Sequence, residues 1–173
     1  MSLFFSGREI IQMALAIEAS GKAFYRAALT RVKEPPVKAA YEHLLVEEDR
    51  HALEFTRLLA GLDQPLAQAP PEGFREYLET LIESRVFNDE EGARQKALEA
   101  KSDVEAVQLG MSMEKDTILF FAEVRDLVRR EDRAVVERIL QEEREHLRRL
   151  ALLRKELAKL KSLQSAQGGA ILT

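Results

Sequence analysis

The chain has 173 residues, of which 46% are hydrophobic and 32% charged, with a formal net charge of -4 and no cysteine. This length can form one compact domain with its own core, and the composition excludes a disordered or fibrous chain. The absence of cysteine excludes disulfides, thiolate nucleophiles, iron-sulfur clusters and cysteine-ligated zinc within these residues, so a bound metal must have oxygen and nitrogen ligands.

The N-terminal residues do not resemble a signal peptide, because the apolar run Ile10 to Ile17 is interrupted by Gln12 and closed by Glu18. No stretch approaches the roughly 20 apolar residues that a membrane span requires. Basic residues alternate with acidic ones and form no patch typical of nucleic-acid binding. We therefore expect a cytoplasmic protein that binds neither nucleic acid nor a membrane.

Two helices are predicted in the first third of the chain. Apolar residues recur at three- and four-residue steps from about Arg8 to Arg31, which is the period of one helix face. Pro35 and Pro36 end this helix and suit the first turn of the next one. We expect the second helix to end near Ala60, with Gly61 as its cap.

A crossover, residues 61–102, follows the second helix. Three prolines make residues 62–73 irregular, since proline disrupts a helix interior or a central strand. Short helical patterns occupy about Phe74 to Phe87 and Glu90 to Ala100. Neither is long enough to be stable alone, so both should pack against the main helices.

Two long helices are predicted after the crossover. Ser102 and Glu105 form a capping box at the start of the third helix, which should continue to about Val128. A turn at 129–132 leads to a fourth helix from about Arg133 to about Leu163.

Two antiparallel helix pairs joined by such a crossover predict an all-α four-helix bundle with one long connection. We assign residues 1–165 to a single domain and residues 166–173 to a mobile tail.

Each helix pair carries the same chemical pattern. A glutamate lies in the apolar stripe of the first helix, and Glu-Glu-x-x-His lies in that of the second. The two copies are related by a shift of 95 or 96 residues, so the pattern is an internal repeat that carries its own ligands. The members of the first copy are Glu18, Phe24, Tyr25, Glu47, Glu48 and His51, which correspond to Glu114, Phe120, Phe121, Glu142, Glu143 and His146.

The spacing predicts that the carboxylates lie at one level of the bundle. Glu18 and Glu48 are each fifteen residues from Lys33, so they should face each other on neighbouring antiparallel helices. The second pair of carboxylates is fourteen or fifteen residues from its own turn, which places all four about 20 Å from their loops at about 1.5 Å per residue. A three-residue step keeps the glutamate and histidine of each Glu-x-x-His on the same helix face.

The chemistry of these residues predicts a two-metal site. The surrounding stripe positions are apolar, and four uncompensated charges there would be severely destabilising. Two divalent cations cancel four carboxylate charges, and two neutral imidazoles complete the ligand shells. Iron is the expected metal, and manganese and zinc also suit these ligands. The expected ligands are Glu18, Glu48, His51, Glu114, Glu143 and His146. The alternative is a metal-free helical module in which these side chains are merely packed.

The roles of four further residues stay open. Tyr25, seven residues after Glu18, could pack in the core with a satisfied hydroxyl or donate a hydrogen bond to a ligand carboxylate. Glu47 and Glu142 point about 100° away from their neighbours, so they are either solvated charges or hydrogen-bond partners of ligands. His43 is expected to pack or lie at the surface rather than bind metal. No catalytic residue is predicted beyond the metal ligands.

At Glu18-x6-Tyr25, Glu47-Glu48-x-x-His51, Glu114 and Glu142-Glu143-x-x-His146, the chain resembles the ferritin-like superfamily, and rubrerythrin-type proteins most. The resemblance covers the four main helices. It implies a di-iron centre in which Glu48 and Glu143 bridge, Glu18 and His51 bind one iron, and Glu114 and His146 bind the other. It also implies a reaction with hydrogen peroxide, or oxidation of ferrous iron with oxygen as in relatives of the rubrerythrins.

The chain departs from the rubrerythrin pattern in two ways. Full-length rubrerythrins contain a cysteine-ligated rubredoxin domain, whereas this sequence has no cysteine, so the resemblance implies a separate electron donor. Rubrerythrins also place a further carboxylate three residues past the first one on the third helix, where this chain has Thr117.

Two functions remain open: a di-iron oxidoreductase acting on peroxide or oxygen, and an iron-binding or ferroxidase protein for storage or buffering. We expect a homodimer in either case.

Overall fold

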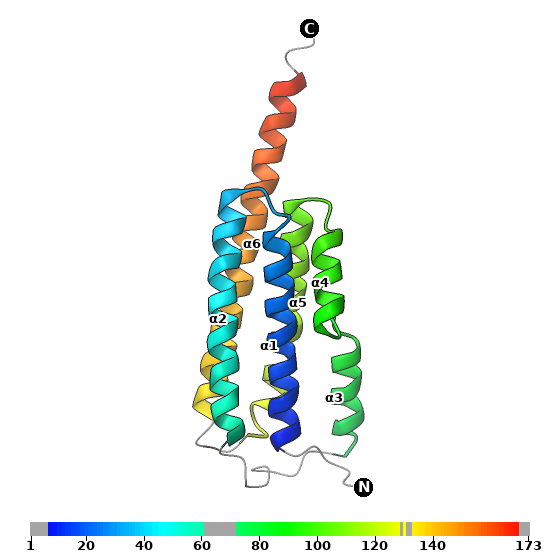
Figure 1. Ribbon diagram of the computed structural model, residues 1–173, viewed down its shortest axis with the longest axis vertical. Coiled ribbons are helices and arrows are strands. Elements are labelled where there is room, and N and C mark those ends of the chain that lie inside the picture. Colours follow the sequence, from blue (N-terminus) through cyan, green and yellow to red (C-terminus); the bar gives the residue numbers. More distant parts are fainter. Residues whose placement is uncertain (1–6, 61–71, 129, 131–132, 170–173) are drawn as a thin grey trace.

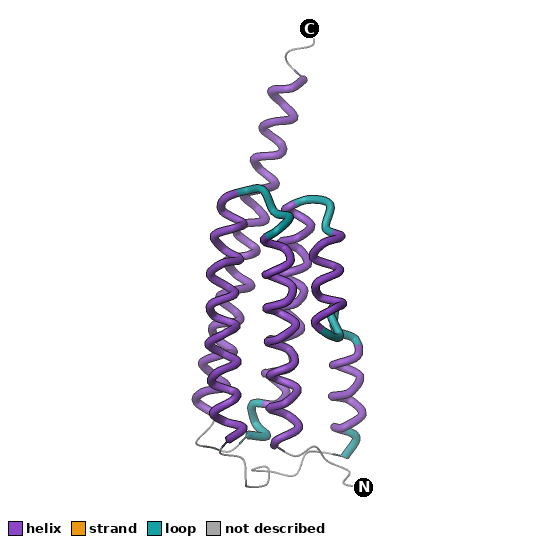
Figure 2. The backbone as a smooth tube through the Cα atoms, viewed as in Figure 1, coloured by secondary structure: helices purple, strands orange, loops and turns teal. Residues whose placement is uncertain are grey.

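The computed structural model describes residues 7–60, 72–128, 130 and 133–169, with side chains as far as residue 162. These residues form six helices and no strand, which confirms the all-α prediction (Figure 1, Figure 2). The helices are α1 (Gly7–Leu29), α2 (Pro35–Ala60), α3 (Phe74–Glu83), α4 (Glu90–Glu99), α5 (Asp103–Val124) and α6 (Arg133–Gly169). None of them is both long and apolar enough to cross a membrane.

The four long helices form the bundle. α1 packs against α2 and α5 against α6, as predicted for the two helix pairs, and α1 also contacts α5 while α2 contacts α6. The two short helices follow one another along the outside of the bundle, where α4 packs against α1 and α3 against α5 (Figure 1). The crossover therefore returns the chain to the end of the bundle that holds the α1–α2 turn, and α5 starts there.

Helix starts agree with the sequence signals where the structure describes them. The hydroxyl of Ser102 accepts a hydrogen bond from the amide of Glu105 at 3.2 Å, as the capping box predicts. Asp89 caps α4 in the same way, accepting from the amide of Gly92 at 2.7 Å. Gly61, most of the segment 62–73 and most of the turn 129–132 lie outside the described residues.

Two predicted ends of the long helices are wrong. α5 ends at Val124 rather than Val128. Beyond Val124 the chain forms a tighter turn, in which the amide of Leu127 donates a hydrogen bond to the carbonyl of Val124, three residues earlier, instead of four. α6 continues to Gly169 rather than ending near Leu163, since the alanine, glutamine and leucine residues of this stretch favour helix. The first four residues of the expected tail are therefore helical, and 170–173 lie outside the described residues.

The first crossover helix is also shorter than predicted, ending at Glu83 rather than near Phe87. Beyond it the chain turns onto the bundle, where the amide of Val86 donates to the carboxylate of Asp116 in α5 at 2.8 Å. Phe87 is buried and its ring stacks on Phe24 at 5.1 Å between centroids. Tertiary contacts thus end a helix that the local sequence would continue.

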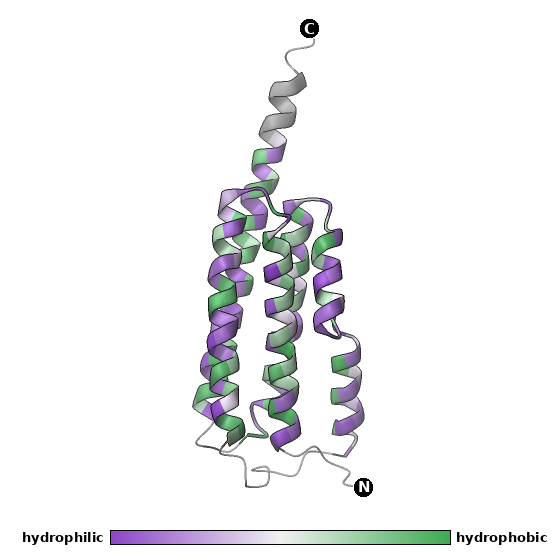
Figure 3. Cartoon of the chain, in the orientation of Figure 1, coloured by the Kyte–Doolittle hydropathy of each residue, from purple (hydrophilic) through white to green (hydrophobic). Residues whose placement is uncertain are grey.

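The core divides into two clusters along the bundle axis. Figure 3 shows apolar and polar residues alternating around each long helix, as expected when one face of the helix is buried. The lower core includes Ile17, Phe55, Phe121 and Leu140. The upper core, nearer the α1–α2 turn, includes Tyr25, Leu44, Met113 and Leu150. On each long helix, the predicted ligands lie between the residues of one cluster and those of the other.

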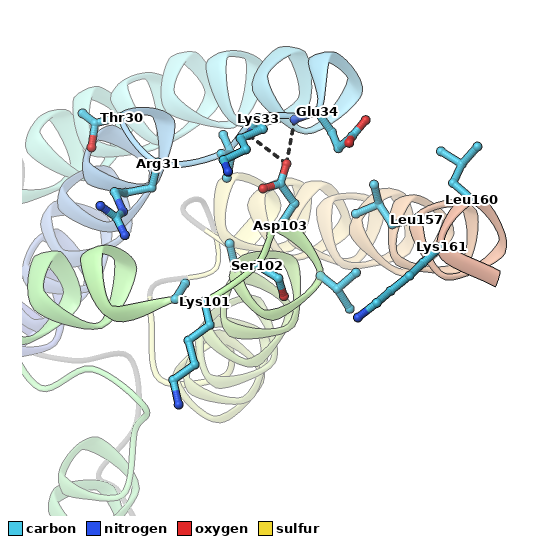
Figure 4. Close-up of a pocket in the computed structure, with 14 residues that line it drawn as sticks. Thr30, Arg31, Lys33, Glu34, Lys101, Ser102, Asp103, Leu157, Leu160 and Lys161 are labelled. Atoms are coloured by element: carbon cyan, nitrogen blue, oxygen red, sulfur yellow. Dashed lines mark hydrogen bonds between the residues drawn. The ribbon is translucent and has the colours of Figure 1, made fainter. Parts of the chain in front are cut away.

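Asp103 joins the α1–α2 turn to the start of α5. Its carboxylate accepts hydrogen bonds from the amides of Lys33 and Glu34 at 2.9 and 2.7 Å (Figure 4). Beside these contacts lies a surface hollow of about 660 Å³, bounded on another side by Leu157 and Leu160 of α6 (Figure 4). None of the predicted metal ligands lines this hollow.

Candidate metal centre

The structure brings all six predicted ligands into the middle of the bundle, one carboxylate from each long helix and one histidine from each of α2 and α6. Their exposed fractions are 0–3%. Because each lies between the lower and upper cores, apolar side chains separate the six residues from solvent along the bundle axis. Charged groups at such depth require compensation by a partner or a metal.

The ligand atoms form two overlapping groups. Within each group, one atom from every residue lies within 4.8 Å of the others. The first group is Glu18, Glu48, His51 and Glu143, and the second is Glu48, Glu114, Glu143 and His146. Glu48 and Glu143 belong to both groups and therefore connect them. Of the remaining residues, Glu18 is in the same group as His51, and Glu114 is in the same group as His146.

Several polar atoms of these residues face one another at short distances. His51 Nδ1 lies 2.9 Å from Glu143 Oε1 and 3.6 Å from Glu18 Oε2. None of these three atoms makes a hydrogen bond within the described residues, and Glu18 Oε1 and Glu114 Oε2 lack one as well. These buried lone pairs suit cations placed among them, so the donor set fits a two-metal centre.

Burial and mutual repulsion shift the pKa values of the carboxyl groups. Burial is the largest cause, and it raises the pKa of Glu18 to about 8 and those of Glu48 and Glu114 well above their ordinary value. Burial also tends to raise the pKa of Glu143, but the neighbouring imidazoles of His146 and His51 lower it. For His51, burial opposes the charged form, yet Glu143 and the other carboxylates raise its pKa to about 9. The group therefore holds protons that metal binding would displace.

Tyr25 and Glu142 both contact predicted ligands. The buried hydroxyl of Tyr25 donates a hydrogen bond to Glu114 Oε1, the functional alternative for this residue. Glu142 Oε2 lies 3.0 Å from His51 Nε2, on the side of the ring that faces away from the carboxylates. Burial tends to raise the pKa of Glu142, but hydrogen bonds to Arg50 and His51 outweigh this effect and lower the pKa.

Glu47 and His43 contact none of the predicted ligands directly. Glu47 pairs with Arg50, which also reaches Glu142 at 2.9 Å. An oxygen of Glu47 lies within 4.8 Å of a ring nitrogen of His51 and of an oxygen of Glu142, but its hydrogen bond is to Arg50. His43 is exposed and contacts Arg149 at 2.7 Å, which agrees with its expected surface position.

Two residues that the sequence reasoning did not single out adjoin the centre. A Cβ atom at Gly21 would lie 3.2 Å from the carboxylate of Glu48, so glycine leaves the room that this carboxylate occupies. Arg50 holds Glu142 in place. Gly21 is three residues after Glu18 on the ligand stripe, and Arg50 directly precedes His51, so position relative to the ligands was the available signal.

Comparison with known proteins identifies one family. A sequence model of the family described as Rubrerythrin matches residues 9–154, which include all six predicted ligands. Searches of curated proteins and of solved structures find no significant match.

Proposed function

This chain belongs to the rubrerythrin family, and we propose that it is a di-iron carboxylate protein that reduces hydrogen peroxide or oxygen. The observation that carries the proposal is the pair of overlapping ligand groups that share Glu48 and Glu143. A bound pair of ferrous ions supplies the two electrons that reductive cleavage of an O–O bond consumes.

The side chains of this protein would hold the metals and keep water away. Glu48 and Glu143 would span both ions, and Glu18 with His51 and Glu114 with His146 would each complete one of them. Phe24 and the other core residues above and below the ligands exclude bulk solvent. Such exclusion protects a reactive centre from side reactions.

Protons near the centre are held at defined atoms. The Tyr25 hydroxyl keeps its proton and donates it in a hydrogen bond to Glu114 Oε1, and a proton on His51 Nε2 would lie between that nitrogen and Glu142. With the proton on Nε2, the Nδ1 atom of His51 carries a free lone pair toward the buried carboxylates, as a ligand nitrogen must.

Reduction of peroxide to two waters consumes two protons and two electrons, and the 173 residues contain no cysteine-ligated redox centre. We propose that a separate donor supplies the electrons, and that the protein acts in the cytoplasm as a homodimer.

A second function is favoured by one residue. Thr117 is buried at the position where the rubrerythrin pattern has a further carboxylate, and a threonine hydroxyl is a poor substitute for that ligand. A plainer site of six ligands also suits an iron-binding or ferroxidase protein that stores or buffers iron.

Rapid mixing of the iron-loaded, reduced protein with either oxidant separates these functions. The proposal predicts that stoichiometric peroxide oxidises the iron faster than oxygen does, and that peroxide is consumed repeatedly when a reductant is present. Glu48→Gln should abolish this turnover, whereas Glu42→Gln, at an exposed position of the same helix, should leave it unchanged. Oxidation by oxygen alone, with many irons retained per chain, would favour storage. If the Glu48→Gln variant retained both its metal and its activity, that result would contradict both functions.

A further inference from the structure

The internal repeat is broken beside the ligands at two places. Arg50 corresponds to Glu145 under the shift of 95 residues, and Tyr25 corresponds to Phe121 under the shift of 96. Each exchange changes the charge or the hydrogen-bonding capacity of a side chain in one copy only. The two halves of the centre therefore have matching ligands but different surroundings.

The first difference concerns the histidines. Arg50 contacts Glu142 at 2.9 Å and also pairs with Glu47, and Glu142 in turn lies 3.0 Å from His51 Nε2. His51 thus has a carboxylate behind its outer nitrogen, held in place by a guanidinium group. A carboxylate acceptor on the outer nitrogen fixes the tautomer of a histidine ligand and increases its basicity.

His146 has no equivalent support. Its repeat-related carboxylate would be Glu47, but Arg50 holds Glu47 instead. Within the described part of the chain, the only polar contact of His146 is between its Nδ1 and Glu143 Oε2 at 3.2 Å. Its ring otherwise stacks near that of His51, with centroids 5.9 Å apart.

The second difference concerns Glu18 and Glu114, the carboxylates that belong to one ligand group each. Like the first difference, it favours the position at Glu18 and His51. The Tyr25 hydroxyl bonds to one oxygen of Glu114, which reduces the electron density that this carboxylate can offer to a cation. Phe121 can make no such bond to Glu18, and both oxygens of Glu18 lack a hydrogen-bond donor among the described residues. Glu18 can therefore use both oxygens as ligand atoms.

From these differences we infer that the two metal positions are unequal, and that the position at Glu18 and His51 binds its ion first and more tightly. Glu142 and Arg50 act as positioning residues for His51. The position at Glu114 and His146 binds second and exchanges its ion more readily. This inference rests on the proposed two-metal site, but not on its reaction with peroxide or oxygen.

Titration of the metal-free full chain with Co²⁺ tests this order, followed by visible absorption and calorimetry. The native protein should bind the first ion at least about tenfold more tightly than the second, since such outer partners typically change metal affinity by about 10–100-fold. His51→Gln should remove the tight step, whereas His146→Gln should retain it. Two equal steps in the native protein, or equal effects of the two histidine variants, would overturn the inference.

The positioning role is tested with a matched pair of variants at repeat-related positions. Glu142→Gln should weaken the first step by about 10–100-fold and leave the second unchanged, whereas Glu47→Gln should preserve both steps. Arg50→Gln provides a second variant, partly exposed, that should weaken the first step in the same direction. An unchanged first step in folded Glu142→Gln or Arg50→Gln, verified by circular dichroism, would refute the role.

Failure of this inference differs from failure of the proposed function. Unequal Co²⁺ steps in a protein whose iron-loaded form ignores peroxide and oxygen would leave the inference standing and remove the proposed reaction. Equal Co²⁺ steps in a protein that turns over peroxide would remove the inference and leave the proposed reaction standing.

Discussion

Removal of the metal should make the stability of this bundle fall as pH rises. The perturbation is chelation of the two ions that we propose, which leaves four buried carboxyl groups beside two histidines. Burial raises the pKa of Glu18 from its ordinary 4.5 to about 8, and the pKa values of Glu48 and Glu114 are also raised. The folded chain then binds more protons than the unfolded chain between about pH 4.5 and 8.

The sign and the magnitude follow from proton linkage. A group whose pKa is raised on folding contributes stability that is present below its unfolded pKa and lost as pH rises through its folded pKa. Each such group changes the free energy of unfolding by about 1.4 kcal/mol per pH unit. Glu18 alone therefore removes about 2 kcal/mol between pH 5.5 and 7.0. His51, whose pKa is raised to about 9, adds to the loss above pH 6.5. Glu143, whose pKa is lowered, contributes a constant amount above about pH 4.5 and makes stability depend on pH only below that value.

The assay is urea unfolding of the metal-free and metal-loaded proteins at several pH values between 5.5 and 7.0, followed by far-ultraviolet circular dichroism. Metal should restore stability, by about 2.7 kcal/mol at a free concentration 100 times its Kd, and should flatten the pH dependence. Glu18→Gln imitates the protonated carboxyl group, so the metal-free variant should lose part of the slope. Glu42→Gln is the exposed control. A metal-free stability that is constant or rises with pH would refute the reasoning, and stability unaffected by chelation would favour a metal-free module.

Two further substitutions test individual contacts. Gly21→Ala would place a methyl group 3.2 Å from the Glu48 carboxylate and should weaken metal binding about tenfold. Gly110→Ala is the control, because its added carbon would make contacts of 3.4 Å or longer and should leave the affinity unchanged. Equal Co²⁺ affinities in the two variants would argue against a crowded carboxylate. Tyr25→Phe frees Glu114 Oε1 and should strengthen the second Co²⁺ step while leaving the first unchanged, and a weakened second step would show that the hydroxyl instead supports binding.

Much of the centre was predictable because helical spacing is local. A three-residue step places Glu48 and His51 on one helix face wherever that helix lies. Equal distances from a turn then set Glu18 level with Glu48. The structure assembles the side chains as this reasoning expects, although the prediction that they bind metal still awaits the titrations above.

Helix ends were less predictable where tertiary contacts compete with local preference. The pattern after Phe74 favours a longer helix, but the bond from Val86 to Asp116 and the stacking of Phe87 end it at Glu83. Neither contact is encoded by neighbouring residues, since Asp116 is 30 residues away from Val86.

The sequence by itself determined the fold class, the level of the carboxylates and the identities of the six candidate ligands, because each depends on helical period and distance along the chain. Only the tertiary structure decided between the two readings of Tyr25 and separated Glu142 from Glu47. In the sequence the two glutamates are equivalent members of a repeat. Their difference arises because Arg50 of α2 reaches across to Glu142 of α6. A contact between helices depends on the separation of the helices and on side-chain conformations, which no spacing along one helix specifies.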